Sequence, residues 1–426
     1  MTDNIFLKRL FQAYYTEKAE YIPSVTSFKH REFGFIPWDK QIMVRHLGFE
    51  NGKDLKQYFS RSAPRHAYNS GALYSNPNNQ DMGSKDYLGC DLIFDIDVDH
   101  FYTPCKEDHD YWFCLECGAT GSGIIEKCPS CKKLKFKKIT WICSKCLDTA
   151  KNEIKKLVFD FLKPDFAIDE KNMKIAFSGH RGYHLKIEEE RIRTLSSDER
   201  REIVEYITGE NISFEILGLR AVSQKIYGIL KNNMGWSNKL VNKIEEILQK
   251  PDKELKLILT DKNKFGLTPK MAESLITYKQ DFLNTLSGDQ RNVWAIEGFG
   301  IQSWRNFLRK IADEVGVEVD VPVSIDLHRL IRYPGSLHGK TGFKVQEIRL
   351  DYLDEFDPLD EQIKKLDPVV FKSEKNITHK VEITAEKVPI TVIKGETFGP
   401  YNKGEKVDVP HHIAVFLLCK GVVKTI

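Results

Sequence analysis

The stretch LIFDIDVD, residues Leu92 to Asp99, indicates most about the fold of this chain. Apolar and acidic residues alternate in it, which is the two-residue period of a β-strand with two different faces. One face is expected to carry Asp95, Asp97 and Asp99, and the other to enter a hydrophobic core through Leu92, Phe94, Ile96 and Val98. The pattern therefore predicts a strand over Leu92–Val98 in an α/β protein.

Three carboxylates on one face of a strand are unfavourable unless something neutralises or solvates their charge. Alternate residues of a strand lie roughly 6.6 Å apart, and like charges that close repel one another and raise one another's pKa. Side chains at this spacing can converge on divalent cations about 3.5–4 Å apart, as nucleotidyl transfer requires. The alternative is a solvated strand at the edge of a sheet.

Composition sets the class of protein. The chain has 426 residues, of which 41% are hydrophobic and 29% charged, so more than one globular domain is expected. No run of about 18 apolar residues is present and the N-terminus lacks a signal-peptide core, so we expect a cytoplasmic protein without a membrane span. The net charge of +3 does not by itself indicate a nucleic-acid partner. One local basic run could contact phosphates or be a solvated face: Lys132, Lys133, Lys135, Lys137 and Lys138.

Seven of the nine cysteines lie between Cys105 and Cys146, which favours metal sites over disulfides in a cytoplasmic chain. Two Cys-x-x-Cys pairs predict a structural zinc ribbon, with unliganded thiols as the alternative: Cys114, Cys117, Cys128 and Cys131. The third pair needs two more ligands, for which the upstream Cys105 and His109 are preferred over His100. The second predicted zinc site is therefore Cys105, His109, Cys143 and Cys146.

One further segment could bind a phosphate, and another only resembles a phosphate-binding loop. SGHRGYH, Ser178–His184, is predicted to turn between strands Met173–Phe177 and Tyr183–Ile187, either as an anion site or as a plain tight turn. GSLHGKTG, Gly335–Gly342, is not a P-loop, because only three residues separate Gly335 from Gly339 where that motif has four.

In VEVDVPVSIDLHRLIRYP a strand followed by a short helix before Tyr333 is expected. A Thr268 N-cap followed by Pro269 predicts one helix through KMAESLITYKQDFLNTL.

FDIDVDH, SGHRGYHL and DVPVSIDLHRLIRYPGSLHGKTG occur in the order seen in the catalytic subunit of archaeal and eukaryotic DNA primases, and the chain resembles that family. HREFGF, QIMVRHLGF and the closing HHIAVFLLCKG extend the likeness over nearly the whole chain. The resemblance implies an α/β (α+β) primase-type catalytic core with a mixed sheet, a zinc-binding insertion and a mainly helical insertion. The expected boundaries are 1–99, 147–196 and 316–355 for the core, 100–146 for the zinc-binding insertion, 197–315 for the helical insertion, and 356–426 for a C-terminal extension with a closing helix.

The resemblance also implies roles for single residues. Asp95, Asp97 and Asp320 match the family's catalytic ligands of two Mg²⁺ or Mn²⁺ ions, with Asp326 as a competitor for the third position. The residues that match nucleotide ligands are Arg45, Ser178, Arg181, His184, Arg332 and His338. The four-cysteine ribbon departs from the single zinc site usual in the family, and His180 stands where some relatives have another basic residue.

The implied function is that of a DNA primase catalytic subunit, which synthesises short primers de novo on single-stranded DNA from NTPs or dNTPs. The implied partner is an iron–sulfur-containing primase large subunit, in a heterodimer. A primase-polymerase of the same superfamily, working in repair or on a plasmid, is the near alternative. A non-catalytic zinc-ribbon protein that binds nucleic acid is the alternative from another class.

Overall fold

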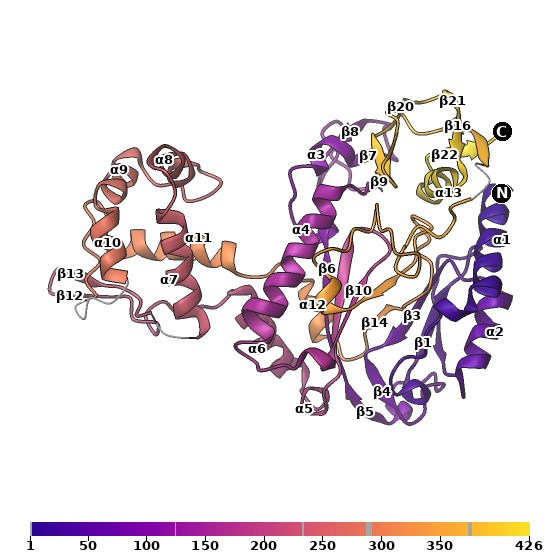
Figure 1. Ribbon diagram of the computed structural model, residues 1–426, viewed down its shortest axis with the longest axis horizontal. Helices are drawn as coiled ribbons and strands as arrows, with labels where there is room; N and C mark the ends of the chain where they lie inside the picture. Colours follow the sequence, from indigo (N-terminus) through magenta and orange to yellow (C-terminus); the bar gives the residue numbers. More distant parts are fainter. Residues whose placement is uncertain (1, 124, 232–233, 287–291, 374–376) are drawn as a thin grey trace. The chain divides into compact units, whose positions relative to one another are not determined.

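The chain forms two compact units (Figure 1). The computed structural model describes residues 2–123, 125–231, 234–286, 292–373 and 377–426. Unit 1 consists of 1–154, 169–201 and 319–426, and unit 2 of 155–168 and 202–318. Among the described helices, none combines the length and the apolar character that crossing a membrane requires.

Two four-stranded sheets form the centre of unit 1. The first has the order β14-β3-β1-β2, from Leu330–Arg332, His66–Ser70, Phe33–Ile36 and Val44–Leu47. The second has the order β15-β10-β11-β6, from Gln346–Ile348, Met173–Phe177, Gly182–Ile187 and Leu92–Asp97. A two-stranded sheet pairs β4 (Ala72–Tyr74) with β5 (Tyr87–Cys90).

The prediction of a mixed sheet was wrong, because every strand pairing in the described residues is antiparallel. β10 and β11 are joined by a tight turn, which only antiparallel neighbours allow. β6 and β10 run in the same direction, but β11 lies between them. The direction of a strand relative to its neighbour depends on this order, which the strand sequences do not contain.

The acidic strand β6 has the two faces that its sequence predicts. Leu92, Phe94 and Ile96 are at most 1% exposed, whereas Asp95 and Asp97 are partly exposed on the other face. The strand ends at Asp97 rather than Val98, and Val98–His100 form a 3-10 turn. Asp99 therefore leaves the row of carboxylates that strict alternation predicted.

The segment that follows unit 2 brings a helix against β6. α12 (Val321–Ile325) begins after Asp320, and its Val323 packs with Ile93 of β6 and Ile331 of β14. The main-chain N–H of Asp320 donates to the carbonyl of Asp95 at 2.9 Å. The predicted order of strand then helix was wrong here: the helix comes first, and the strand β14 follows it.

The cysteine-rich segment forms its own small sheet. α3 (Lys106–His109) precedes a sheet of order β8-β7-β9, from Thr120–Ser122, Tyr111–Cys114 and Phe136–Ile139. α4 (Ser144–Lys155) follows and continues into a π-helical segment, Lys156–Leu162. The cysteines therefore lie at strand ends, in turns and at the beginning of a helix.

Unit 1 contains further α-helices and strands. They are α1 (Thr2–Glu17), α2 (Gly52–Ser62), α5 (Glu190–Arg193), β16 (Thr378–Ile383), β17 (Lys387–Val388), β18 (Thr391–Ile393), β19 (Glu396–Phe398), β20 (Tyr401–Asn402), β21 (Lys406–Pro410), α13 (His411–Lys420) and β22 (Val423–Thr425). The two chain ends meet, since the Thr425 hydroxyl donates to the Asp3 carboxylate at 2.6 Å. α13 is the predicted closing helix, and it is buried along nearly its whole length.

Unit 2 is mainly helical around an aromatic core. α6 (Ser197–Thr208) leads into it, and its other elements are β12 (Arg220–Val222), β13 (Lys225–Tyr227), α7 (Gly235–Leu248), α8 (Asp252–Thr260), α9 (Pro269–Thr277), α10 (Lys279–Leu286) and α11 (Ile301–Val315). Trp304 is fully buried, with ring centroids of Phe299 and Trp294 at 4.4 and 4.8 Å. The Thr268 N-cap is confirmed, but the single helix predicted after it breaks at Tyr278.

Candidate functional site

The acidic cluster is built from β6 and the start of α12. Asp95 is hydrogen-bonded through its main-chain carbonyl to Asp320, and Asp97 is the last residue of the same strand. The carboxylate of Asp320 lies 3.6 Å from Nε2 of His100, the residue held in reserve as a zinc ligand. The structure thus brings the three predicted acids to neighbouring backbone positions. Their oxygens do not form a group within 4.8 Å of one another in the described part of the chain, as the cysteine groups do.

His184 faces Asp95 across the two strands. The two residues are register partners in the β11–β6 pair, and Nε2 of His184 lies 3.2 Å from Oδ1 of Asp95. This oxygen is buried without an aligned hydrogen-bond donor, which suits an atom that a cation would contact. The predicted competitor Asp326 instead accepts from the main-chain N–H of His328 through its side chain, at the end of α12.

Asp97 is in an environment that disfavours its charge. Burial, followed by the negative charges of Asp99 and Asp95, raises the pKa of Asp97 from 3.8 to about 6. Its Oδ1 accepts a hydrogen bond of 2.9 Å from the main-chain N–H of Asp99. A divalent cation would relieve this repulsion, so the carboxylates fit the chemistry of Mg²⁺ or Mn²⁺.

A cluster of basic side chains includes Arg332, which lines one cavity together with His184. Three buried histidines form its centre, with ring centroids 5.0 Å apart between His66 and His338 and 5.3 Å apart between His338 and His180. Arg332 Nη1 is 2.8 Å from Nδ1 of His66, and Lys420 Nζ is 2.6 Å from Nε2 of His180. We call these five residues the basic cluster.

Burial and neighbouring cations keep the imidazoles of the basic cluster uncharged. Burial first, and then the positive charges of Arg332, Lys340 or Lys420, lower the pKa of His66, His180 and His338 well below 6.5. The main-chain N–H of Lys340 donates to Nδ1 of His338, and that of Gly339 donates to Nδ1 of His66. In the neutral ring, Nε2 of both then carries the proton and can donate to an anion.

The turn Ser178–His184 packs directly against the basic cluster. Gly179 has φ +84°, and a Cβ there would lie 2.7 Å from Cβ of His338, so only glycine allows this approach. Ser178 is buried, and its hydroxyl accepts a 3.4 Å hydrogen bond from the main-chain N–H of His180. This places the predicted residues Ser178, His184, Arg332 and His338 in one region.

Two predicted nucleotide ligands are engaged elsewhere. Arg181 is 1% exposed, and its donors are taken up by Asp99, Asp110 and the carbonyl of Trp141. Arg45 donates from Nε to the buried Glu32 at 2.9 Å. The structure therefore leaves the guanidinium of Arg181 no donor for a phosphate, and it pairs Arg45 with a carboxylate.

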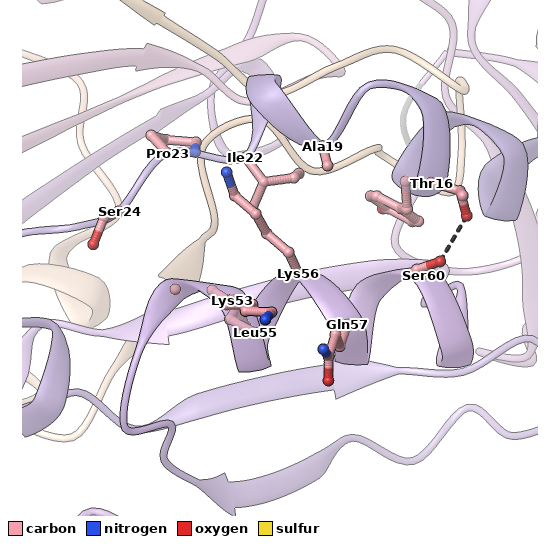
Figure 2. A pocket seen from close by; sticks show the side chains of 12 residues that line it. Thr16, Ala19, Ile22, Pro23, Ser24, Lys53, Leu55, Lys56, Gln57 and Ser60 are labelled. Carbon is pink, nitrogen blue, oxygen red and sulfur yellow. Dashed lines mark hydrogen bonds between the residues drawn. The ribbon is translucent and has the colours of Figure 1, made fainter.

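Two cavities of unit 1 differ in their relation to the site. The first, of about 160 Å³, is lined by His184 and Arg332, with Asn69, Lys174 and Glu347 among the other residues. The second, of about 500 Å³, lies between α1 and α2, where Thr16 and Ser60 share a 2.6 Å hydrogen bond (Figure 2). Of these two, the first contains predicted nucleotide ligands in its lining and the second contains none.

Both predicted cysteine groups are assembled. The ligand atoms of Cys105, His109, Cys143 and Cys146 lie within 4.8 Å of one another, and so do those of Cys114, Cys117, Cys128 and Cys131. Pairs of Sγ atoms are 3.4 to 3.7 Å apart, too far for a disulfide. Four thiolates about 2.3 Å from a zinc ion would have sulfurs about 3.8 Å apart, so both groups can hold zinc.

The mixed Cys/His group has the outer contact typical of a metal-binding histidine. Nε2 of His109 lies 3.3 and 3.5 Å from the sulfurs of Cys143 and Cys146, and Nδ1 lies 2.8 Å from Oδ1 of Asp110. A carboxylate on the other ring nitrogen fixes the ring orientation and raises the basicity of the ligand. Burial by itself raises the pKa of Asp110, but hydrogen bonds from His109 and Arg181 outweigh it and hold that pKa below its ordinary range.

Sequence reasoning missed part of the basic cluster. His66 stands in PRHAYNS with no motif to mark it, and Lys420 is a single cation at the end of an apolar helix. Lys340 is not one of the five residues, but its main-chain N–H donates to His338, and GSLHGK could have indicated it. His180 was noted only as a departure.

Comparisons with known proteins agree on one family. A family model described as DNA primase small subunit matches residues 127–350. A DNA primase small subunit PriS from Methanospirillum hungatei is 31% identical, over 98% of this chain and 96% of the relative. Its namesake from Archaeoglobus fulgidus is 31% identical over 99% and 98%, and that from Methanocella arvoryzae 29% over 98% and 97%. The chain belongs to the DNA primase small subunit family.

Proposed function

We propose that this chain is the catalytic subunit of a DNA primase, which joins nucleotides into short primers on single-stranded DNA by two-metal-ion catalysis. Three observations carry the proposal. Asp95 and Asp97 share one face of β6, and the main-chain N–H of Asp320 donates to the carbonyl of Asp95. His184, 3.2 Å from the Asp95 carboxylate, lines one cavity together with Arg332 of the basic cluster. Nucleotidyl transfer needs carboxylates that bind metal ions, and close to them basic side chains that bind a triphosphate.

The three carboxylates would hold two Mg²⁺ or Mn²⁺ ions, which lower the pKa of an attacking hydroxyl and stabilise charge on the phosphates. Asp95 and Asp97 supply oxygens from one strand face, and the hydrogen bond to Asp95 fixes the position of Asp320. Nε2 of His184, on the neighbouring strand, lies 3.2 Å from the carboxylate of Asp95.

The basic cluster would bind the triphosphate of the incoming NTP or dNTP. His338 and His66 would present Nε2–H donors, and Arg332 would supply positive charge. Lys420 would add an N–H donor, although burial and the charges of Arg181 and Lys340 lower its pKa well below the ordinary lysine value. Ser178 adds a hydroxyl from the neighbouring turn. Charge-assisted hydrogen bonds of this kind are about twice as strong as neutral ones. Arg181 is not part of the proposed phosphate site, because Asp99, Asp110 and the carbonyl of Trp141 occupy its donors. Arg45 stays a proposed nucleotide ligand, since Glu32 accepts only its Nε–H.

The two cysteine groups are proposed to hold one structural zinc each, within an insertion at residues 100–146, and residues 197–315 are proposed to be a helical insertion. Closed four-ligand sites have no open position for catalysis. The proposed partner is an iron–sulfur-containing primase large subunit in a heterodimer, acting on template in the cytoplasm. This rests on the family alone.

The test is primer synthesis on bare single-stranded DNA with Mn²⁺ and labelled nucleotide, with NTP and dNTP compared. Wild-type protein should form dinucleotides and longer products, and Asp97→Asn should form none while it retains its fold and zinc. An Asp97→Asn protein that still makes dinucleotides would contradict the mechanism. Asp39→Asn, at an exposed acid, is the matched control.

A further inference from the structure

Asp110 joins a predicted metal ligand to the rest of unit 1. It is 5% exposed, and its Oδ1 lies 2.8 Å from Nδ1 of His109. The same oxygen accepts the main-chain N–H of Trp141 at 2.9 Å. The ring orientation of His109 is therefore tied to that of the Asp110 carboxylate.

The Asp110 carboxylate also accepts a two-pronged contact from Arg181. Nη1 donates to Oδ1 at 2.9 Å and Nη2 donates to Oδ2 at 2.8 Å, which is the paired geometry that guanidinium and carboxylate planes favour. Nη1 also donates to the carbonyl of Trp141 at 2.9 Å. Since Arg181 is 1% exposed, water does not compete for these contacts.

The other edge of Arg181 reaches the acidic strand. Its Nε donates to Oδ1 of Asp99 at 2.5 Å, and Nη2 forms an ion pair with the same oxygen. The main-chain N–H of Asp99 in turn donates to Oδ1 of Asp97 at 2.9 Å. All five N–H groups of this guanidinium are thereby occupied.

We propose that Asp110 and Arg181 are positioning residues that couple the mixed Cys/His metal group, which contains His109, to the catalytic carboxylate of Asp97. This rests on the proposed function, because it needs Asp97 to be a ligand of the catalytic cations. A metal on Nε2 of His109 fixes the ring, Asp110 follows it, and Arg181 passes the constraint to Asp99 and so to Asp97. The zinc insertion then acts on catalysis without contacting nucleotide.

A plain structural role for Arg181, holding the Ser178–His184 turn, is the competing explanation. It predicts that variants lose stability but that folded protein binds catalytic cations normally. Coupling predicts weaker cation binding in protein that is folded and carries its zinc. The readout must therefore be cation affinity rather than activity.

The test measures Mn²⁺ binding by electron paramagnetic resonance, without nucleotide, on protein purified with zinc. Asp110→Asn keeps an oxygen for His109 but cannot accept both donors of Arg181, and the fraction of the variant that retains its zinc should bind Mn²⁺ about tenfold more weakly. Asp108→Asn makes the same charge change at an exposed position two residues away, and should bind as wild type does. Asp110→Glu, which keeps the carboxylate, should recover part of the affinity.

Arg181→Lys is the second variant, in case Asp110→Asn fails to fold. Lysine keeps the charge but not the fork, so it cannot contact Asp99 and Asp110 with the same geometry, and the same loss is expected. Asp97→Asn distinguishes a failure of the proposed catalytic site from a failure of the coupling. If it binds Mn²⁺ like wild type, the proposed catalytic site is wrong. If it loses Mn²⁺ while folded Asp110→Asn and Arg181→Lys match Asp108→Asn, only the coupling is overturned.

Discussion

Replacing Asp97 by asparagine should stabilise the protein in the absence of catalytic cations. Burial and the charges of Asp99 and Asp95 raise the pKa of Asp97 from 3.8 to about 6 in the folded state. The native state therefore binds a proton more tightly than the unfolded state does. The free energy of unfolding therefore falls as pH rises from about 4 to about 6, and it stays low above pH 6.

The size of the stabilisation follows from the same pKa shift of Asp97. About two pKa units correspond to about 3 kcal/mol at pH 8, a loss that a neutral asparagine avoids. Asparagine can keep the hydrogen bond from the N–H of Asp99, since its own Oδ1 remains an acceptor. For a unit of roughly 300 residues the entropy of unfolding is about 0.6 kcal/mol per kelvin, so Tm should rise by about 5 °C.

The assay is thermal unfolding in buffer without added divalent cations, at pH 8 and pH 5. At pH 5 the native carboxyl is mostly protonated already, and the gain from Asp97→Asn should fall to about half. Mn²⁺ should raise the Tm of wild type but not of the variant. The exposed Asp39→Asn should change neither. The reasoning is refuted if Asp97→Asn is destabilising at pH 8, or if its gain is equal at both pH values.

Three further outcomes are expected. Because the pKa of His338 is lowered in the free protein and a bound triphosphate would raise it, nucleotide binding should take up protons and KM for NTP should fall from pH 8 to pH 6; calorimetry in buffers of different ionisation enthalpy measures the uptake, and no uptake would contradict the proposed phosphate site. Cys128→Ser should lower zinc content from about two to about one per chain by elemental analysis, whereas an unchanged content would rule out the four-cysteine site. Trp304→Ala, at the centre of the aromatic core of unit 2, should cost about 3–5 kcal/mol of stability in urea titration, and a cost under about 1 kcal/mol would mean that this core is loosely packed.

The acidic strand and the cysteine groups were predictable, because each depends on the spacing of residues that are close in the sequence. Alternation in LIFDIDVD was enough to place Asp95 and Asp97 on one face, since side-chain direction in a strand depends only on position. Cys-x-x-Cys spacing was enough to group the cysteines, because two thiolates that close together serve one metal ion. The pairing of Cys143 and Cys146 with Cys105 and His109 was predicted as well, and the structure brings these four residues together.

The basic cluster was only partly predictable, because it is assembled from distant segments. His66 comes from β3, His338 from the loop after β14 and Lys420 from the end of α13, and nothing local to any of them indicates the other two. Arg181 shows the opposite case. Its motif suggested a phosphate ligand, but burial between Asp99 and Asp110 gives it carboxylate partners that lie 82 and 71 residues away in sequence.

By itself, then, the sequence determined that Asp95 and Asp97 share one face of β6 and that the cysteines form two groups. The tertiary structure decided three things: that the sheets are antiparallel, that Asp320 joins Asp95, and that Arg181 binds acids rather than remaining free for phosphate. The physical reason is the range of the interactions. Strand periodicity and ligand spacing act over a few residues, whereas strand order and the partners of a buried charge depend on segments that meet only when the chain has folded.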